Sequence, residues 1–281
     1  MLERVGAGAR KILRQLAGLS FKSLTREDRA RLIEHYLEST ITEVSIDGTK
    51  LRFVTPTPTL LWRAKYLRSK EPETMDWIKS FSANDVLWDI GANIGAYSIC
   101  AAALKQCHVL AFEPSADNYM VLCRNVEANG LQSHITPYCM AFAGSTKIAF
   151  LNSNSRDLGA ALNQFGDRGE RSLYWTGKLG SCVQGMLGYR IDNFIQQFKP
   201  LRPVHLKIDV DGLELDILHG AMDTLSDRSL KSVMVELNPD DNHEIETVIS
   251  VMTKEAGFKL ELRGKMQMSA DAKAQNHLFV R

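Results

Sequence analysis

A lysine and two aspartates alternate with apolar residues between positions 206 and 212. Lys207, Asp209 and Asp211 are spaced two apart, so in a β-strand their side chains would share one face. Carboxylates there could remove a proton from a hydroxyl group or, with Glu236 after a later apolar run, bind Mg²⁺. Positioning alone is a third alternative. We expect these four residues to form the catalytic site, with Asp209 as the leading candidate.

The same stretch also has structural explanations. Lys207 could be the buried ion-pair partner of a neighbouring acid, and Asp211 could cap the helix that follows it. Glu214 falls in the first turn of that helix, where an acid stabilises the helix dipole. His243 is a further candidate base but is expected to be a polar residue at a helix start, and His205 is expected to be a core histidine.

A strand, a glycine turn and a helix follow one another in the stretch 86–105. The apolar run V-L-W-D-I (86–90) precedes Gly91, which permits a tight turn, and Gly95, which lets the helix pack close to the strand. A dinucleotide-binding turn has another glycine at the position of Asn93, because a pyrophosphate needs close backbone approach. Asn93 therefore disfavours NAD and favours an adenosine ligand without phosphates, such as S-adenosylmethionine.

Two acids at strand ends are placed to hold such a ligand. Asp89 lies just before the glycine turn, where it could bind an amino group directly or through water. Glu113 follows the next apolar run, 22 residues after Gly91, at the distance expected of an acid that accepts hydrogen bonds from ribose hydroxyls. We expect these two acids to lie together with residues 206–212 at the carboxyl edge of one sheet.

From residue 85 onward, strand patterns alternate with helix patterns, which predicts an α/β fold with a doubly wound, mostly parallel sheet. Strands are expected at 86–90, 109–112, 135–143, 204–210 and 232–237, with 147–151 as a short extension of the sheet. Helices are expected at 96–105, 117–129, 213–225 and 243–256, with a short strand–helix unit at 189–198. The runs 258–262 and 277–280 should form a final antiparallel pair.

Residues 1–70 are predicted to be an N-terminal extension made of an amphipathic helix, a second helix and a β-hairpin. The first helix is basic, with apolar residues at helical spacing between 12 and 19, and is expected to pack on its own domain or stay mobile. Docking on a membrane or a partner is the alternative. Residues 25–28 form a capping box, and Asp47-Gly48 marks the hairpin turn. Helices are expected at 60–67 and 72–81, and they should wall the ligand cleft.

The window 152–190 breaks the alternation of strands and helices. It holds seven of the 19 glycines and begins with N-S-N-S. Long irregular segments inside compact domains are usually functional or disordered. This window is expected to fold over the cleft as a lid or to contact the substrate through Arg171, Tyr174 and Trp175. The alternative is a surface loop without a role.

The composition excludes several classes of protein. The chain has 44% hydrophobic residues and a formal net charge of +1, and neither value indicates nucleic acid as a partner. No apolar run reaches the ~18 residues of a membrane span. The five cysteines lie mostly in apolar segments without C-x-x-C spacing, which predicts reduced core thiols and a cytoplasmic location. The N-terminus lacks the continuous apolar region of a secretory signal.

Four motifs occur in a fixed order along the chain. They are D-I-G-A-N-I-G (89–95), F-E-P (112–114), K-I-D-V-D-G-L-E (207–214) and V-E-L-N (235–238). Together they resemble the FkbM family of S-adenosylmethionine-dependent methyltransferases. Asp211 stands where that family usually has glutamate, so this carboxylate is one methylene shorter. The resemblance implies a class I methyltransferase, Rossmann-like fold in a domain spanning 71–281, with 152–190 as an insertion.

The resemblance also implies an O-methyltransferase that acts on a hydroxyl of a carbohydrate or other small metabolite. It places Asp89, Gly91, Asn93 and Gly95 along the methionine part of the cofactor, Glu113 at its ribose, Ala141 and Phe142 at its adenine, and Asp209 beside the reactive methyl group. The implied partner is a sugar or other small-molecule acceptor, with a homo-oligomer as an open alternative. The rival interpretations are a nicotinamide-dependent dehydrogenase, a non-catalytic binding module and a methyltransferase for a protein substrate.

Overall fold

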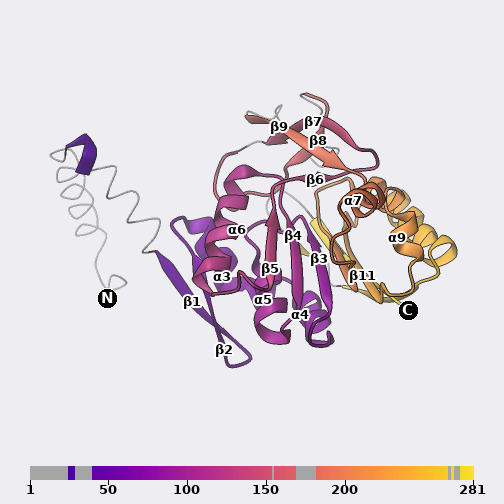
Figure 1. Ribbon diagram of the computed structural model, residues 1–281, viewed down its shortest axis with the longest axis horizontal. Helices are drawn as coiled ribbons and strands as arrows, with labels where there is room; N and C mark the ends of the chain where they lie inside the picture. The colour runs from indigo at the N-terminus through magenta and orange to yellow at the C-terminus, as the bar shows by residue number, and fades with distance from the viewer. Residues whose placement is uncertain (1–24, 29–39, 154, 169–181, 265–266, 269–272) are drawn as a thin grey trace.

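The computed structural model describes residues 25–28, 40–153, 155–168, 182–264, 267–268 and 273–281. Its centre is an eight-stranded sheet in the order β12-β14-β11-β10-β3-β4-β5, with β13 paired to β14 beside this path (Figure 1). The parallel strands are β5 (Ile135–Tyr138), β4 (His108–Phe112), β3 (Val86–Ile90), β10 (His205–Ile208) and β11 (Ser232–Leu237). β14 (Lys273–Val280) runs antiparallel to these strands and pairs with β11, β12 (Lys259–Arg263) and β13 (Gln267–Met268).

Side chains of the central strands alternate between two buried cores, one on each face of the sheet. Leu87 and Val109 belong to the core that also contains side chains of α4 (Pro72–Lys79), α5 (Ala96–Lys105) and α6 (Ala116–Ala128). Trp88 and Leu110 belong to the core built with α7 (Ile191–Phe198), α8 (Glu214–His219), α9 (Met222–Ser226) and α10 (Asn242–Ser250). Because helices cover both faces, the doubly wound, mostly parallel sheet predicted from the sequence is confirmed.

The predicted capping box and β-hairpin are both present. The backbone N–H of Thr25 donates to Asp28 Oδ2 at 3.2 Å, and the N–H of Asp28 donates to Thr25 Oγ1 at 3.1 Å. Strands β1 (Ile41–Ile46) and β2 (Thr49–Val54) pair around Asp47-Gly48, whose positive φ angles of 47° and 83° suit a type I′ turn. The amphipathic helix expected near the N-terminus, and the helix after the capping box, lie outside the described residues.

A proline separates the two helices that lead into the sheet. α3 (Pro58–Lys70) cannot continue past Glu71, because Pro72 lacks a backbone N–H and instead occupies the first turn of α4. Glu71 therefore adopts a non-helical conformation with φ −134° and ψ 73°. This junction places the Glu71 side chain, which is fully buried, inside the protein and beside β10.

A second, four-stranded sheet in the order β6-β9-β7-β8 corrects two strand predictions. The expected strand 135–143 ends at Tyr138, and β6 (Ala141–Phe142) pairs with β9 (Cys182–Tyr189) instead of continuing beside β4. β7 (Lys147–Ser153), expected as an extension of the main sheet, pairs with β9 as well. Apolar alternation shows that a segment is a strand but does not identify its partner.

The window 152–190 is only partly irregular. β8 (Gln164–Gly166) pairs with β7, and β9 fills the end of the window, so both segments belong to the second sheet. The candidate acceptor contacts Arg171, Tyr174 and Trp175 lie outside the described residues. Residues 155–163 of the window lie at the edge of the main sheet.

The helix predicted at 213–225 is two helices, α8 and α9. A Cβ at Gly220, between them, would lie 2.9 Å from the carbonyl oxygen of Ala143. The carboxylate of Asp192 then accepts the backbone N–H of Asp223 at 3.1 Å and of Thr224 at 3.0 Å, and so caps the start of α9. The helix predicted at 243–256 is α10 followed by a π-helical turn, η2 (Val251–Glu255). No helix in the described ranges is both long and apolar enough to cross a lipid bilayer.

Candidate active site

The turn after β3 brings two strand ends into close contact. Gly91 has a φ of +82°, and a Cβ placed on it would lie 1.7 Å from the backbone oxygen of Asp209. Gly95 has a φ of +77°, and a Cβ there would lie 2.2 Å from Cδ1 of Leu122 on α6. Both positions need glycine for close approach as well as for backbone conformation. The strand, glycine turn and helix predicted for this stretch are confirmed.

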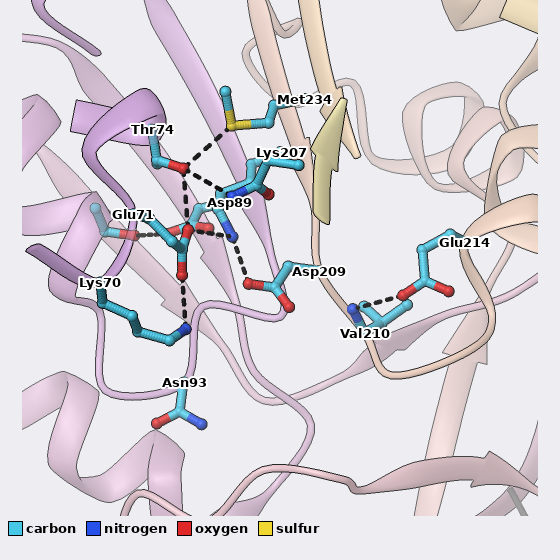
Figure 2. Close-up of polar contacts among 12 residues, drawn as sticks. Lys70, Glu71, Thr74, Asp89, Asn93, Lys207, Asp209, Val210, Glu214 and Met234 are labelled. Atoms are coloured by element: carbon cyan, nitrogen blue, oxygen red, sulfur yellow. Dashed lines mark hydrogen bonds and ion pairs between the residues drawn. The ribbon is translucent and has the colours of Figure 1, made fainter. Parts of the chain in front are cut away.

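Lys207 is the centre of a buried cluster of charged residues (Figure 2). Its side chain is only 2% exposed, and its Nζ lies 2.5 Å from Asp209 Oδ2 and 4.0 Å from Glu71 Oε2. The Nζ of Lys70 lies 2.6 Å from Glu71 Oε1, and Thr74 donates a hydrogen bond of 2.9 Å to Glu71 Oε2. The ion pair between Lys207 and Asp209, which the sequence left as an alternative to catalysis, is present.

Attraction between opposite charges keeps the residues of this cluster ionised. Burial opposes the charge of Lys207, but the carboxylates of Asp209 and Glu71 outweigh burial and raise its pKa above its usual range. Burial would raise the pKa of Asp209, yet Lys207 and Lys70 hold it well below its usual range. The same two lysines lower the pKa of Glu71 against the effect of burial. Both carboxylates are therefore ionised at neutral pH and compensated by lysines.

Two further acids border the cluster. Burial and the charge of Asp209 raise the pKa of Glu236, on β11, well above its usual value, and the two side chains share a hydrogen bond. Burial also raises the pKa of Asp89, against the effect of Lys207, and Asp89 Oδ2 accepts a 2.5 Å hydrogen bond from Ser98. Glu236 therefore holds a proton beside an ionised Asp209.

Asp211 lies apart from Asp209, contrary to the prediction that the two share a strand face. β10 ends before both residues, and Asp211 has a φ of +61°, so the chain has left strand geometry. Its carboxylate accepts the backbone N–H of Leu162 at 2.7 Å and that of Asn163. Burial and the charge of Asp209 raise its pKa to about 6. Asp211 also does not cap α8, whose N-cap residue, Leu213, has no side-chain cap.

The segment 157–163 lies across the carboxyl edge of the main sheet. The N–H of Gly159 donates to Asn118 Oδ1 at 2.8 Å, and its carbonyl accepts from Nε of Arg63 at 2.7 Å. The carbonyl of Ala160 accepts from the side-chain amides of Asn93 and Asn118, both at 3.0 Å. With Asp211, these contacts tie the segment to α3, the glycine turn, α6 and the loop after β10. This part of the window therefore occupies the position expected of a lid.

Glu113 is buried at the end of β4, where it fixes the glycine turn. Its two carboxylate oxygens accept the backbone N–H groups of Asn93 and Ser115, both at 2.8 Å. Burial raises its pKa to about 7, although these hydrogen bonds favour the charged form. Each carboxylate oxygen has a further lone pair, so Glu113 can still accept a hydrogen bond from a ligand. Its contact with a ribose stays a prediction.

Two pockets flank the glycine turn. The first, which we call the charged pocket, has an empty volume of about 450 Å³ and is lined by Asp89, Asn93, Arg63, Lys70, Lys207 and Asp209, among others. The second, which we call the apolar pocket, has an empty volume of about 310 Å³ and is lined by Phe112, Met140, Ala141, Phe142 and Leu213, among others. Gly91 lines both pockets, so they adjoin at the glycine turn.

The two candidate histidines, His243 and His205, lie outside both pockets. His243 is exposed at the start of α10 and lines neither pocket. His205 is buried, with Nδ1 at 2.7 Å from Ser232 Oγ, Nε2 at 3.0 Å from Asp85 Oδ2, and its ring stacked on Phe81 at 3.7 Å. Burial lowers the pKa of His205, so its ring is neutral at pH 7. His205 and Ser232 are buried while Asp85 is partly exposed, so these hydrogen bonds stabilise the fold, as predicted for a core histidine.

Glu214 also has a structural role, at the first position of α8. Its carboxylate accepts the backbone N–H of Val210 at 3.2 Å and that of Gly212 at 2.9 Å. Burial raises its pKa from 4.5 to about 8. The folded protein therefore keeps a proton on Glu214 over a pH range in which the unfolded chain has released it.

Replacing Glu214 by glutamine should flatten the pH dependence of stability. Between pH 4.5 and about 8 the native state holds one more proton than the unfolded state, so wild-type stability falls as pH rises. Between pH 5.5 and pH 7.5, Glu214 should lower the free energy of unfolding of the wild type by up to ~3 kcal/mol. This decrease should be absent in Glu214→Gln. Urea unfolding at both pH values checks this. The control is Glu255→Gln at an exposed position, and parallel curves for wild type and Glu214→Gln would contradict the assignment.

Three residues of the site were not anticipated from the sequence. Arg63, Lys70 and Glu71 all come from α3 or its end, and the helix predicted at 60–67 stops before two of them. The one available signal was a charged residue followed by proline between two helices, which marks a junction. Nothing in that signal indicates that the acid is buried.

A doubly wound sheet with a glycine turn after its first strand, and an antiparallel strand between its last two, defines a class I methyltransferase. The acids at its carboxyl edge surround the pocket next to that turn. The chain belongs to the FkbM methyltransferase family, because the family description "Methyltransferase FkbM domain" matches residues 89–260. It is an S-adenosylmethionine-dependent methyltransferase.

Several known proteins are similar to this chain. "Hexuronic acid methyltransferase AglP" of Haloferax volcanii is 27% identical over 201 residues, which are 70% of this chain and 74% of AglP. TYW2 of M. jannaschii, solved in complex with AdoMet, has a TM-score of 0.45 at 13% identity, over 86% of this chain and 85% of that one. Precorrin-6y C5,15-methyltransferase from Geobacter metallireducens has a TM-score of 0.43 at 10% identity, over 75% and 86%.

Proposed function

We propose that this protein transfers a methyl group from S-adenosylmethionine to a hydroxyl group of a carbohydrate or related small metabolite. The observation that carries the proposal is the pair of pockets that meet at Gly91, one charged and one apolar. The similarity to AglP, a hexuronic acid methyltransferase, over 70% of the chain supports a sugar-like acceptor.

The two pockets fit the two ends of the cofactor. The apolar pocket, with Ala141 and Phe142 among its lining residues, suits a flat adenine ring. The charged pocket offers Asp89 to an ammonium group. The side-chain oxygen Oδ1 of Asn93 is buried and has no hydrogen-bond partner within the described residues, so it is a further acceptor for that group. When bound, the cofactor supplies an electrophilic methyl group.

The protein's own contribution to the reaction is to hold the acceptor hydroxyl. Asp209 lines the charged pocket and is ionised, so its carboxylate can accept a hydrogen bond from that hydroxyl. Lys207 fixes this carboxylate at 2.5 Å, and Glu236 holds a proton beside it. Because its low pKa makes Asp209 a weak base, we propose that positioning of the acceptor supplies most of the rate enhancement.

The proposal includes no Mg²⁺. The ligand set expected from the sequence does not assemble, because Asp211 is bound to the 157–163 segment. The acids whose oxygens lie within 4.8 Å of one another are Glu71, Asp209 and Glu236. Lys70 and Lys207 already neutralise this group, so a divalent cation would leave an excess of positive charge there.

The proposal is tested by calorimetric titration of the full chain with S-adenosylmethionine, S-adenosylhomocysteine and NAD. We expect binding of the first two and none of NAD. Transfer of labelled methyl groups is then measured on a sugar acid and on the matching neutral sugar. Cofactor binding without transfer to either sugar would contradict the acceptor class and favour a binding module or a protein substrate. Absence of cofactor binding would contradict the proposal as a whole.

Alanine substitutions at Asp89 and at Glu113 are expected to weaken cofactor binding about 10- to 100-fold each, the loss of a hydrogen bond to a charged group. Both acids lie at strand ends around the glycine turn, and the domain should remain folded. Calorimetric affinity and a circular dichroism melt check the two parts of this expectation. Glu127→Ala, at an exposed position of α6, is the control. Unchanged affinity in both variants would refute the placement of the cofactor.

A cytoplasmic location completes the proposal. Cys100, Cys107, Cys123 and Cys139 are free thiols, and two of them, Cys100 and Cys107, are buried. Burial raises the pKa of Cys100 to about 12, which keeps this thiol protonated and unreactive. Unpaired thiols of this kind are typical of proteins from a reducing compartment.

A further inference from the structure

The charged pocket has two sides of opposite charge. Its acidic side comes from strand ends, with Asp89 at the end of β3 and Asp209 just after β10. Its basic side comes from α3, where Arg63, Leu67 and Lys70 line the pocket at the spacing of one helix face. A ligand that carries one positive and one negative group at the same end would match this arrangement.

Arg63 is held in place while part of its guanidinium stays unengaged. Its Nε donates to the carbonyl of Gly159 at 2.7 Å, which fixes the plane of the group. Its terminal nitrogens have no hydrogen-bond or ion-pair partner within the described part of the chain. A guanidinium anchored at Nε presents the remaining donors in a fixed fork, which suits a carboxylate.

Lys70 offers a second positive group to the same pocket. Its Nζ donates to Glu71 at 2.6 Å, and an ammonium group has two further protons to donate. Figure 2 shows this ammonium group extending from Glu71 toward the side of the cluster where Asn93 lies, and both Lys70 and Asn93 line the charged pocket. Lys207 also lines it but is only 2% exposed and bound to Asp209, so Arg63 and Lys70 are the cations that can meet a ligand.

We infer that Arg63 and Lys70 bind the α-carboxylate of the cofactor's methionine end, while Asp89 across the pocket receives its ammonium group. The inference rests on the proposed cofactor site and assigns to α3, which precedes the matched family region, a direct part in cofactor recognition. It follows from charge, because Asp89 and Asp209 would repel a carboxylate on their own side of the pocket.

The test compares two ligands that differ in the amino-acid end, which contains this carboxylate. S-adenosylhomocysteine carries the amino-acid end, and 5′-methylthioadenosine lacks it. In calorimetric titrations Arg63→Met should weaken S-adenosylhomocysteine binding about 10- to 100-fold and leave methylthioadenosine binding within about 2-fold. Lys70→Gln should show the same selectivity, and Arg63→Lys should recover part of the loss. Lys65→Met, exposed on the same helix, is the matched control and should bind both ligands as wild type does.

Three results would overturn the inference. Equal loss for both ligands would mean that Arg63 acts by holding the 157–163 segment. Unchanged S-adenosylhomocysteine binding in Arg63→Met and Lys70→Gln, with a wild type that binds it, would place the carboxylate elsewhere and leave the proposed function intact. A wild type that binds neither ligand would remove the proposed cofactor site together with the inference.

Discussion

Replacing Lys207 by methionine is expected to lower the free energy of unfolding by about 3–5 kcal/mol, the cost of removing one partner from a buried ion pair. Methionine matches most of the lysine chain in volume, so loss of packing contributes little. The cost arises because Asp209 and Glu71 would stay buried without their shared lysine. Their pKa values should then rise, and the destabilisation should be larger at pH 7.5 than at pH 5, where the acids can take up protons.

Urea unfolding of the wild type and Lys207→Met at the two pH values measures this effect. The matched control is Lys50→Met, which removes an ion pair of similar length, 2.8 Å to Glu43, from an exposed position. Exposed pairs contribute about 0–1 kcal/mol, so the control should change little. Adding Asp209→Asn to Lys207→Met should restore part of the lost stability. Equal effects in the buried and exposed variants would show that Lys207 does not compensate the acids.

Replacing Gly91 by alanine is expected to destabilise the protein strongly, because the added methyl group has no room. The added Cβ would lie 1.7 Å from the backbone oxygen of Asp209, and backbone cannot move aside as a flexible side chain can. The turn after β3 and the loop after β10 would have to separate, which opens the wall shared by both pockets. We expect a loss of at least about 3 kcal/mol, at or beyond the usual range for overpacked cores.

Gly257→Ala is the control that separates steric contact from backbone strain. Gly257 has a φ of +74°, similar to the +82° of Gly91, but a Cβ there would meet nothing within 4 Å. It should therefore cost only the strain of a left-handed alanine, about 1–2 kcal/mol. Urea unfolding, or recovery of folded protein if Gly91→Ala fails to fold, compares the two. Equal losses would mean that the close approach of the two loops is unimportant for stability.

Features whose chemistry lies within a few residues could be predicted from the sequence. The capping box needs only Thr25 and Asp28, and the hairpin turn needs only Asp47-Gly48. The parallel strands could also be placed, because a strand buried on both faces is a continuous apolar run. Asp89 and Asp209 lie together at the carboxyl edge of these strands, as expected.

The errors arose where a partner from distant sequence decides the outcome. The burial of Glu71 depends on where the junction between α3 and α4 lies relative to Lys207 on β10, which no local pattern records. Asp211 obeys the spacing of a strand but has left-handed backbone, so its side chain turns to the 157–163 segment. β7 has the right pattern for the main sheet and joins another one. In each case the sequence identifies the residue or the strand but does not identify the neighbour that it contacts.

The position of β14 has a consequence for how the chain is made. β14 follows the other described strands of its sheet in sequence and is made after them, yet it pairs along the whole of β11, from Ser232 with Val280 to Leu237 with Gln275. Until residues 273–280 have emerged, the outer edge of β11 carries open hydrogen-bonding groups beside apolar side chains. A nascent chain that has already formed its parallel strands is therefore open to pairing with other chains at this edge, and it becomes safe from that association only when β14 has been added.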